Sequence, residues 1–490
     1  MTEAAPSELA RDAEWQRLDP RMLLVHPIRE VLRYLPVIVV VVLGSTAAGG
    51  EQWQLIGVGI PVGLGLLRYL TTSFRISAGR IELRRGLLNR HVLSTPVDRV
   101  RTVDLTSSPI HRLLGLTKVR IGTGTASTSD EDRIDLDGLP LDRARALRVE
   151  LLQTSTADDL AAPEQAEVDV VTFDPAWLWL APLTGSGVVI AAAALGALSQ
   201  LLQTTGFFES FDTQRVHAPG ASPAVLVPLL VLAVLVVISL LSIGGYAVTN
   251  WGFRLTRSRA AKTWHLTRGL LTTRETTLDD DRLAGVTLSE PLGLRLARGA
   301  RLSAIVTGLS KSQQGSSMLV PPAPRRVVER VARDVLDTPA PVDVDLLPHG
   351  PRATRRRWTR ALLPALVVAL GCVGAVVLDA PSWLLVGVLA VPVATLLAAD
   401  RSRSLGHALV VGHLVSRSGC LVRRRRVIEV EHVIGWNLRA TWFQRRAGLT
   451  TLVATTAGGS QAVPVLDVPE DEAVRVAHEA LPDLLAQFTR

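Results

Sequence analysis

The stretch Phe74–Leu105 reads FRISAGRIELRRGLLNRHVLSTPVDRVRTVDL and begins only a few residues after a long apolar run. Apolar and polar residues alternate through its first part, which indicates a β-hairpin that turns at Ala78-Gly79. The segment RGLLNRHVLSTP indicates a second hairpin that turns near Gly86 and Asn89. The sequence therefore predicts an arginine-rich, antiparallel β domain next to a segment suited to a membrane.

Two diverged copies of this stretch follow later in the chain. Aligning Gly86, Gly269 and Gly419 brings RRGLL over TRGLL and RSGCL. Each aligned glycine is followed by an acidic and a basic residue, then by a leucine, and then by a second glycine. These residues are Asp98-Arg99, Leu105 and Gly115 in the first copy, Asp281-Arg282, Leu288 and Gly299 in the second, and Glu431-His432, Leu438 and Gly448 in the third. Near-constant spacing of this kind is typical of an internal repeat.

A helix is expected to close each copy, at residues 141–153, 324–336 and 469–488. The expected helices start at or just after a proline, which is favoured at a helix start because its missing N–H has no intrahelical partner. Strands followed by one helix predict a small antiparallel sandwich or open barrel that the helix closes at one end.

Apolar runs separate the three copies. Hydrophobic residues make up 48% of the 490 residues, although 20% are charged. A helix crosses a hydrocarbon core of about 30 Å with about 20 mostly apolar residues. Six runs approach this length in three close pairs, which makes six buried core helices a poor alternative: Leu32–Ala48, Trp53–Leu70, Trp177–Leu202, Ala224–Val248, Ala361–Leu378 and Ser382–Ala399.

The charges flanking these runs predict their orientation. Of the 53 basic residues, only Arg215 lies in the short linkers within the pairs. The positive-inside rule therefore predicts a multi-pass protein of the cell membrane with both termini in the cytoplasm. Tryptophans at run ends, Trp177 among them, are expected at the membrane interface. The polar N-terminus lacks the basic-then-apolar order of a signal peptide.

Three transmembrane pairs, each followed by a cytoplasmic β domain with a C-terminal helix, account for the whole chain. The expected boundaries are an N-terminal segment 1–31, pair 32–70, domain 71–155, linker 156–176, pair 177–248, domain 249–338, basic linker 339–360, pair 361–399 and domain 400–490.

The motifs RIELRRGLLNR, PVDRVRTVDL and RLLGL resemble the bacterial pleckstrin-homology-like (PH-like) domain, formerly catalogued as domain of unknown function 304. The alternation of helix pairs and domains resembles multi-domain membrane proteins of that family from Gram-positive bacteria. The first copy resembles the family most closely. The second departs from it at Ala260–Thr263 and with DDDRL in place of PVDRV. The third is the loosest, because Glu431-His432 replaces Asp-Arg.

Two sets of residues are singled out as candidate sites. Arginines of the predicted strands are candidates for contact with lipid phosphates or a partner, worth about 1 kcal/mol each near an anionic leaflet; the alternative is a solvated face that keeps sheet edges from aggregating. They are Arg84, Arg85, Arg90, Arg423, Arg424, Arg425 and Arg426. The repeated glycines and acidic-basic pairs are expected to be structural positions.

Known catalytic motifs are absent from the sequence. Asp279-Asp280-Asp281 falls on the repeated acidic-basic position, and GTGTAST at Gly122–Thr128 lacks the GK[ST] of a phosphate loop. There is no HExxH and no GxSxG. We therefore expect no cofactor, no metal and no catalysis.

The expected function is a cytoplasmic-face scaffold in envelope maintenance or protection. Its expected partners are anionic membrane lipid and either a homo-oligomer or, as the resemblance implies, a smaller PH-like membrane protein, but not nucleic acid. The alternatives are a component of a membrane export or transport system and an uncharacterised membrane enzyme. The lack of intramembrane charges argues against ion-coupled transport.

Overall fold

The structure is a computed structural model that describes residues 15–17, 19–22, 25, 71–77, 80–85, 91–96, 102–122, 134–153, 168–184, 196, 199–200, 223–260, 262–307, 317–458 and 460–482. The chain divides into two compact units. Met1–Pro182 and Ser186–Asp280 form the N-terminal unit, and Leu183–Gly185 and Asp281–Arg490 form the C-terminal unit. The division falls inside segment 249–338, which the sequence predicts as the second domain.

A four-stranded antiparallel sheet opens the N-terminal unit. Its order is β1 (Gln16–Arg17), β2 (Ser73–Ser77), β3 (Arg80–Arg85) and β4 (His91–Pro96). Ser77 pairs with Arg80, which confirms the predicted turn at Ala78-Gly79. Arg85 pairs with His91, so the second predicted hairpin is also present.

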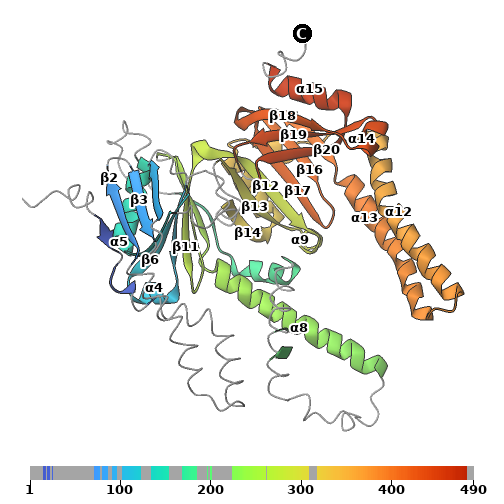
Figure 1. Ribbon diagram of the computed structural model, residues 1–490, viewed down its shortest axis with the longest axis horizontal. Helices are drawn as coiled ribbons and strands as arrows, with labels where there is room; N and C mark the ends of the chain where they lie inside the picture. The colour runs from blue at the N-terminus through green and yellow to red at the C-terminus, as the bar shows by residue number, and fades with distance from the viewer. Residues whose placement is uncertain are drawn as a thin grey trace, which may run out of the picture. The chain divides into compact units, whose positions relative to one another are not determined.

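The second sheet of this unit is built from two repeats. Its strands are β5 (Thr102–Ser107), β6 (Leu116–Gly122), β7 (Ile134–Pro140), β8 (Val168–Thr172), β9 (Arg254–Ser258), β10 (Thr263–Arg268) and β11 (Thr273–Asp279), in the spatial order β7-β6-β5-β11-β10-β9-β8. The first repeat supplies β5, and the second supplies β11, which pairs with it along its length (Figure 1).

The C-terminal unit repeats this arrangement. A six-stranded sheet has the order β14-β13-β12-β17-β16-β15, and a three-stranded sheet has the order β18-β19-β20. The strands are β12 (Leu283–Pro291), β13 (Gly299–Val306), β14 (Met318–Pro324), β15 (Gly406–Val410), β16 (His413–Ser418), β17 (Val422–Glu429), β18 (Val433–Arg439), β19 (Leu449–Thr456) and β20 (Ala462–Pro469). Again one repeat completes the sheet of the repeat before it, which the prediction of separate small sandwiches did not include.

Apolar side chains from two sheets meet within the first and third repeats. In the first, Ile81 and Leu83 of β3 share a core with Val103 and Leu136. In the third, Leu414 and Ile428 share a core with strands β18 to β20, including Leu452. The predicted packing of sheet against sheet is therefore confirmed for these two repeats.

The predicted closing helices are present. They are α5 (Leu141–Gln153), α10 (Arg325–Val335) and α15 (Glu470–Ala480). Pro324 and Pro469 are the N-cap residues, one position earlier than a first-turn proline. Each repeat has a first half of three strands (β2–β4, β9–β11 or β15–β17) and a second half of three strands (β5–β7, β12–β14 or β18–β20). A short helix follows the first strand of each second half, namely α4 (Pro109–Leu113), α9 (Leu292–Leu296) and α14 (Trp442–Arg446).

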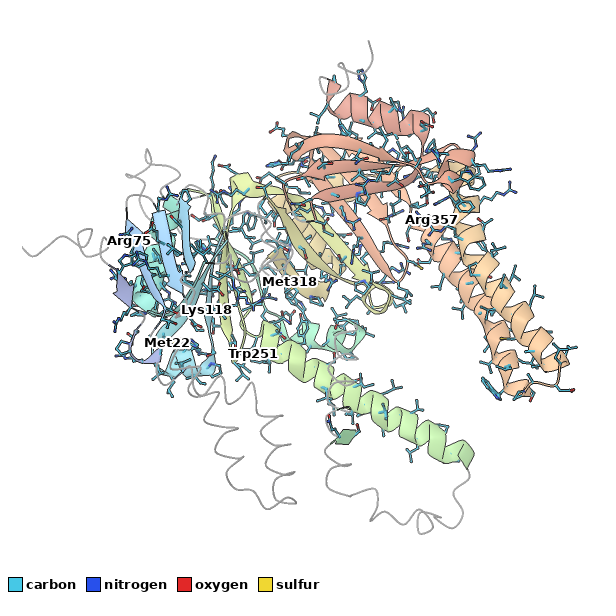
Figure 2. All side chains as sticks on the ribbon, in the orientation of Figure 1. Met22, Arg75, Lys118, Trp251, Met318 and Arg357 are labelled. Atoms are coloured by element: carbon cyan, nitrogen blue, oxygen red, sulfur yellow. The ribbon has the colours of Figure 1, made fainter. Side chains whose placement is uncertain are left out.

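Three helices in the described part of the chain are long and apolar enough to cross a membrane: Val231–Asn250, Gly350–Val377 and Ser382–Arg403. They belong to α8 (Pro223–Asn250), to α12 (Gly350–Val377), and to η6 (Ser382–Leu389) with α13 (Ala390–Arg403). Only 11% of each apolar window is buried within the protein, so most of their side chains project outward (Figure 2). Three of the six predicted runs are thus apolar helices.

The other three runs lie wholly or partly outside the described residues. Leu32–Ala48 and Trp53–Leu70 lie outside the described residues. Trp177–Leu202 begins in a 3₁₀ helix, η3 (Pro175–Thr184), whose Trp177 is 3% exposed and packs against Phe173 and Phe253. The prediction of Trp177 as an interface residue is therefore wrong, because the indole fills the protein core.

Candidate membrane-contact site

The repeated glycine forms a tight turn between two strands. Gly269 joins β10 to β11 with φ +110°, and Gly419 joins β16 to β17 with φ +123°. A Cβ atom would lie 2.1 Å from the carbonyl oxygen of Thr272 in the first turn and 2.1 Å from that of Val422 in the second. Only glycine avoids both the clash and the unfavourable φ. Gly86 lies outside the described residues.

In the N-terminal unit, this turn is hydrogen-bonded to the end of an apolar helix. The amide N–H of Gly269 donates to the carbonyl of Trp251 at 2.9 Å, and that of Leu270 donates to the carbonyl of Val248 at 2.9 Å. Val248 lies in the last turn of α8, and Trp251 follows it (Figure 2). The turn is thus fixed where an apolar helix ends.

The turn in the C-terminal unit is fixed to α13. The Cys420 thiol donates to the carbonyl of Leu397 at 3.4 Å. Asp400, in the same helix, forms ion pairs with Arg295 of α9 at 2.8 Å and with Arg423 of β17 at 3.3 Å. Both units therefore place a glycine turn and a short helix beside the end of an apolar helix.

These turns and short helices expose large apolar side chains. Leu270 and Leu271 are exposed in one turn, and Leu421 in the other. The short helices expose Leu113 on α4, Leu292 and Leu296 on α9, and Trp442 and Phe443 on α14. Apolar and aromatic residues mixed with arginine at the ends of apolar helices are typical of a membrane–water interface.

The arginine run Arg423–Arg426 lies on β17, an interior strand of its sheet. The alternative that it protects a sheet edge is therefore wrong for these residues. Arg423 also donates to Ser404 Oγ at 3.2 Å, and Arg425 donates to the carbonyls of Pro341 and Val344 at 2.9 Å each. These two side chains tie β17 to neighbouring segments.

Arg424 and Arg426 lie on the opposite face of β17 together with Arg301 of β13. In the sheet, Ser289 stands directly between Arg301 and Arg424. Burial, and after it the neighbouring Arg424, lowers the pKa of both Arg301 and Arg426. No hydrogen bond or ion pair joins these three side chains to a described residue. We call Arg301, Arg424 and Arg426 the arginine face.

The matching positions of the N-terminal unit carry less unpaired positive charge. There Lys118 and Arg274 stand on either side of Thr106, as Arg301 and Arg424 do around Ser289. Lys118 forms an ion pair with Asp135 at 2.7 Å, and Asp104 holds the position that Thr287 has in the C-terminal unit. The arginine face is therefore a cationic surface with hydroxyl neighbours, which suits an anion such as a phosphate.

The model of the bacterial PH domain family matches residues 29–155 and 362–480, together just over half of the chain. The chain belongs to the bacterial PH domain family. Each match spans an apolar segment and the strands and helix after it, whereas the second repeat is not matched. The third repeat is thus recognised although the sequence predicts it to be the loosest. No curated protein and no solved structure matches the chain.

The glycine that follows the short helix has a left-handed conformation in the first and third repeats. In the second repeat, the residue before the aligned glycine has this conformation instead. Gly115 and Gly448 follow α4 and α14 with φ +68° and +63°. In the second repeat, Arg298 has this left-handed conformation, with φ +55°, and Gly299 begins β13. The prediction that Gly299 is equivalent to the other two glycines is therefore wrong by one position.

The acidic-basic pairs lie at short 3₁₀ turns before β12 and β18. These are η4 (Asp280–Arg282) and η7 (Val430–His432), which include Asp281-Arg282 and Glu431-His432. The preceding residue, Asp280, also anchors this turn, because it accepts hydrogen bonds from Trp264 Nε1 at 2.8 Å and from Arg257 at 2.7 Å. Sequence comparison pointed to its neighbour because the repeat aligns Asp281. Asp98 and Arg99 lie outside the described residues.

Among the arginines of the first repeat, Arg84 packs over the ring of Trp15, with the guanidinium carbon 3.5 Å from the ring centroid. Such a cation–π contact stabilises the N-terminal segment on β3. Arg90 and the side chain of Arg85 lie outside the described part of the chain. Lipid contact by these three residues stays a prediction.

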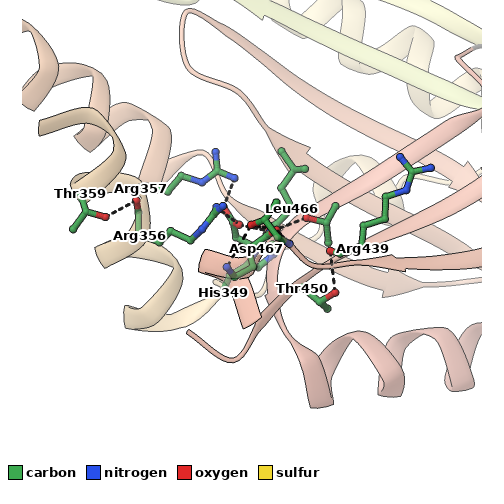
Figure 3. Close-up of polar contacts among 11 residues, drawn as sticks. His349, Arg356, Arg357, Thr359, Arg439, Thr450, Leu466 and Asp467 are labelled. Atoms are coloured by element: carbon green, nitrogen blue, oxygen red, sulfur yellow. Dashed lines mark hydrogen bonds and ion pairs between the residues drawn. The ribbon is translucent and has the colours of Figure 1, made fainter. Parts of the chain in front are cut away.

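No sequence pattern predicted the buried polar cluster at the base of α12. Asp467 of β20 is 1% exposed and forms ion pairs at 2.5 Å with both Arg356 and Arg357 of α12 (Figure 3). The N-cap residue His349 donates from Nδ1 to the carbonyl of Leu466 at 2.8 Å. Its Nε2 lies 3.0 Å from Nδ1 of His407. The cluster ties the start of an apolar helix to the third PH-like domain.

Proposed function

We propose that this bacterial PH-domain protein is a non-catalytic scaffold of the cell membrane. Its PH-like domains bind anionic lipid headgroups and protein partners at the cytoplasmic face, in envelope maintenance or protection. The proposal rests on the hydrogen bonds between the glycine turns and the ends of the apolar helices, because such bonds would hold the β domains against a membrane that these helices cross.

The arginine face supports contact with anionic lipid. Leu421 is exposed at the turn, and Arg424 follows three residues later on β17. Three residues of a strand span roughly 10 Å, so a leucine at the hydrocarbon boundary leaves Arg424 near the height of the headgroups. The adjoining Arg426 and Arg301 add charge that no described carboxylate neutralises.

The test measures the lipids that copurify with the full-length protein in mild detergent. The double variant Arg424→Gln/Arg426→Gln removes two charges that contribute roughly 1 kcal/mol each, so we expect the ratio of anionic to zwitterionic lipid to fall roughly thirty-fold. The matched control is Arg326→Gln/Arg330→Gln, which removes the same charge from exposed positions of α10.

Mass spectrometry of the retained lipids reads out both variants. The proposal expects a loss in the β17 variant and little change in the α10 variant. An unchanged ratio in the β17 variant, or an equal loss in both, contradicts a specific lipid contact at the arginine face.

A further inference from the structure

Among the strands that end the four sheets of the described chain, two belong to the kinds of strand that pair with another sheet half elsewhere in the protein. Where two repeats meet, the last strand of the first half of one repeat pairs with the first strand of the second half of the repeat before it. Strand β11 pairs with β5 in this way, and β17 pairs with β12. The equivalent strands β4 and β18 each end their sheets. The chain thus repeats one junction and leaves one half of it open at each end of the series.

The two junctions share one register. Leu105 and Leu288 hold the same repeat position, and they pair with Glu275 and Arg425, which also hold the same position. Thr102 pairs with Leu278 and Gly285 pairs with Ile428, again equivalent positions. Applied to the open edges, this register sets Leu438 of β18 opposite Val92 of β4.

The edge of β18 exposes side chains that the junctions bury. Leu105 and Leu288 are 2% and 6% exposed, whereas the equivalent Leu438 is 43% exposed. Ala284 is fully buried, whereas the equivalent Ile434 is 63% exposed. On the other edge, Val92 is 53% exposed. Both edges are therefore apolar where the shared register brings them together.

The space beside β18 is also open. A Cβ atom on Gly285 would lie 2.1 Å from the carbonyl oxygen of Val427 on the paired strand β17. The equivalent Gly435 of β18 has no atom within 4 Å of a Cβ built in the same way. A β-bulge precedes both glycines, so β12 and β18 present the same edge.

We propose that β18 of one copy pairs antiparallel with β4 of a second copy of this chain. Every copy has both edges, and the register of this pairing is already used twice within the chain. The contact is head-to-tail, so it generates a ring or an open row of copies. Anchoring in one membrane raises the effective concentration of the edges. This inference does not depend on lipid binding.

The test uses two full-length copies with different tags in the same cells, both with Cys372→Ala and Cys420→Ala. One copy has Val92→Cys and the other has Leu438→Cys. Residues directly opposite one another have Cβ atoms about 5 Å apart, so a short thiol crosslinker should give a product that has both tags. The control replaces Leu438→Cys by Asn437→Cys, which points to the opposite face of the sheet.

A product with Leu438→Cys and at least tenfold less with Asn437→Cys supports the pairing. Equal products contradict the register. The absence of a doubly tagged product contradicts the pairing between copies. If a third variant with both Val92→Cys and Leu438→Cys then crosslinks within its own chain, the two edges close within one copy and the proposal is overturned. Crosslinking of Val92→Cys to a smaller PH-like protein instead overturns the choice of a second copy.

A substitution without cysteine chemistry tests the same edge. Leu438→Glu leaves an exposed charge in a single copy but buries it in the junction, so it should abolish copurification of the two tagged chains. The matched control Val474→Glu, at a residue of α15 that is 44% exposed, should leave copurification intact. Loss in both variants, or in neither, contradicts the proposal.

Discussion

At the scale of residues, burial decides which charged side chains in the C-terminal unit need partners. Asp467 is a buried carboxylate whose charge is tolerated because Arg356 and Arg357 neutralise it and Gln444 donates a hydrogen bond at 2.8 Å. Arg423 likewise depends on Asp400. The arginine face has no such partner among the described residues, and this contrast is the reason that we propose it as a binding surface.

The histidine at the same joint makes the stability of the third PH-like domain depend on pH. Burial, and after it the neighbouring His407, lowers the pKa of His349 from 6.5 to about 4. The folded protein therefore binds fewer protons than the unfolded chain between these values, so stability is complete above pH 6.5 and falls as the pH drops towards 4. At 1.36 kcal/mol per pKa unit, the loss is about 3 kcal/mol.

Thermal unfolding of the full-length protein in detergent between pH 7 and 4 measures this dependence. His349→Asn keeps a donor for the carbonyl of Leu466 and removes the titrating ring, so its pH dependence should be weaker. The control His478→Asn changes an exposed histidine of α15 and should follow the original protein. An unaltered slope in His349→Asn would show that another group dominates.

At the scale of elements, a turn needs a backbone conformation that only some residues adopt. The turns at Gly269 and Gly419 share a positive φ and the same close approach of a carbonyl. Both turns are also hydrogen-bonded to the end of an apolar helix, α8 or α13. The glycine of this turn is the clearest feature that the repeats share in sequence. A structural requirement therefore accounts for the glycine at both of these positions.

Gly419→Ala is expected to destabilise the C-terminal unit by about 3 kcal/mol, because it combines a left-handed residue with a carbonyl clash. Gly412→Ala is the matched control. Gly412 has φ +68° but open space around its missing Cβ, so strain alone should cost about 1 kcal/mol. Thermal unfolding of the two variants compares them, and equal losses would rule out the clash as the main cause.

At the scale of the whole molecule, the third apolar pair forms a hairpin attached to one PH-like domain at both ends. Arg356 and Arg357 bind the start of α12 to that domain, and Asp400 binds the end of α13 to it through Arg423. Both ends of the hairpin therefore lie against the same domain. The predicted orientation requires both ends on one side of the membrane, and which side that is stays a prediction.

The orientation of the chain is testable with fused reporters. A reporter that is active only outside the cell should be active after Gln214, within a linker that has one arginine, and silent after Gly138 of β7. The reverse pattern would invert the predicted orientation, and equal activity at both sites would contradict a membrane crossing by the predicted run Trp177–Leu202 between them.

Local patterns in the sequence determined the strands, the turns, the closing helices and the apolar helices of this protein. Alternation along a strand, a glycine at a tight turn and a run of apolar residues depend on neighbours in the chain, so the sequence shows them directly. The predicted helix Leu141–Gln153 matches α5 residue for residue for this reason. The same patterns placed Arg423–Arg426 on a strand but could not show which of them face a partner.

Only the tertiary structure decided that β5 pairs with β11 and β12 with β17, and that Asp467 neutralises two arginines of α12. Strand pairing is made by backbone groups that are nearly the same in every residue. The sequence of an edge strand therefore does not show which strand pairs with it. In the sequence, Arg356 and Arg357 are charges that flank an apolar run. The structure shows that the carboxylate of Asp467, from distant β20, lies beside them. Contacts between distant segments, unlike turns and strands, leave no periodic mark in a single sequence.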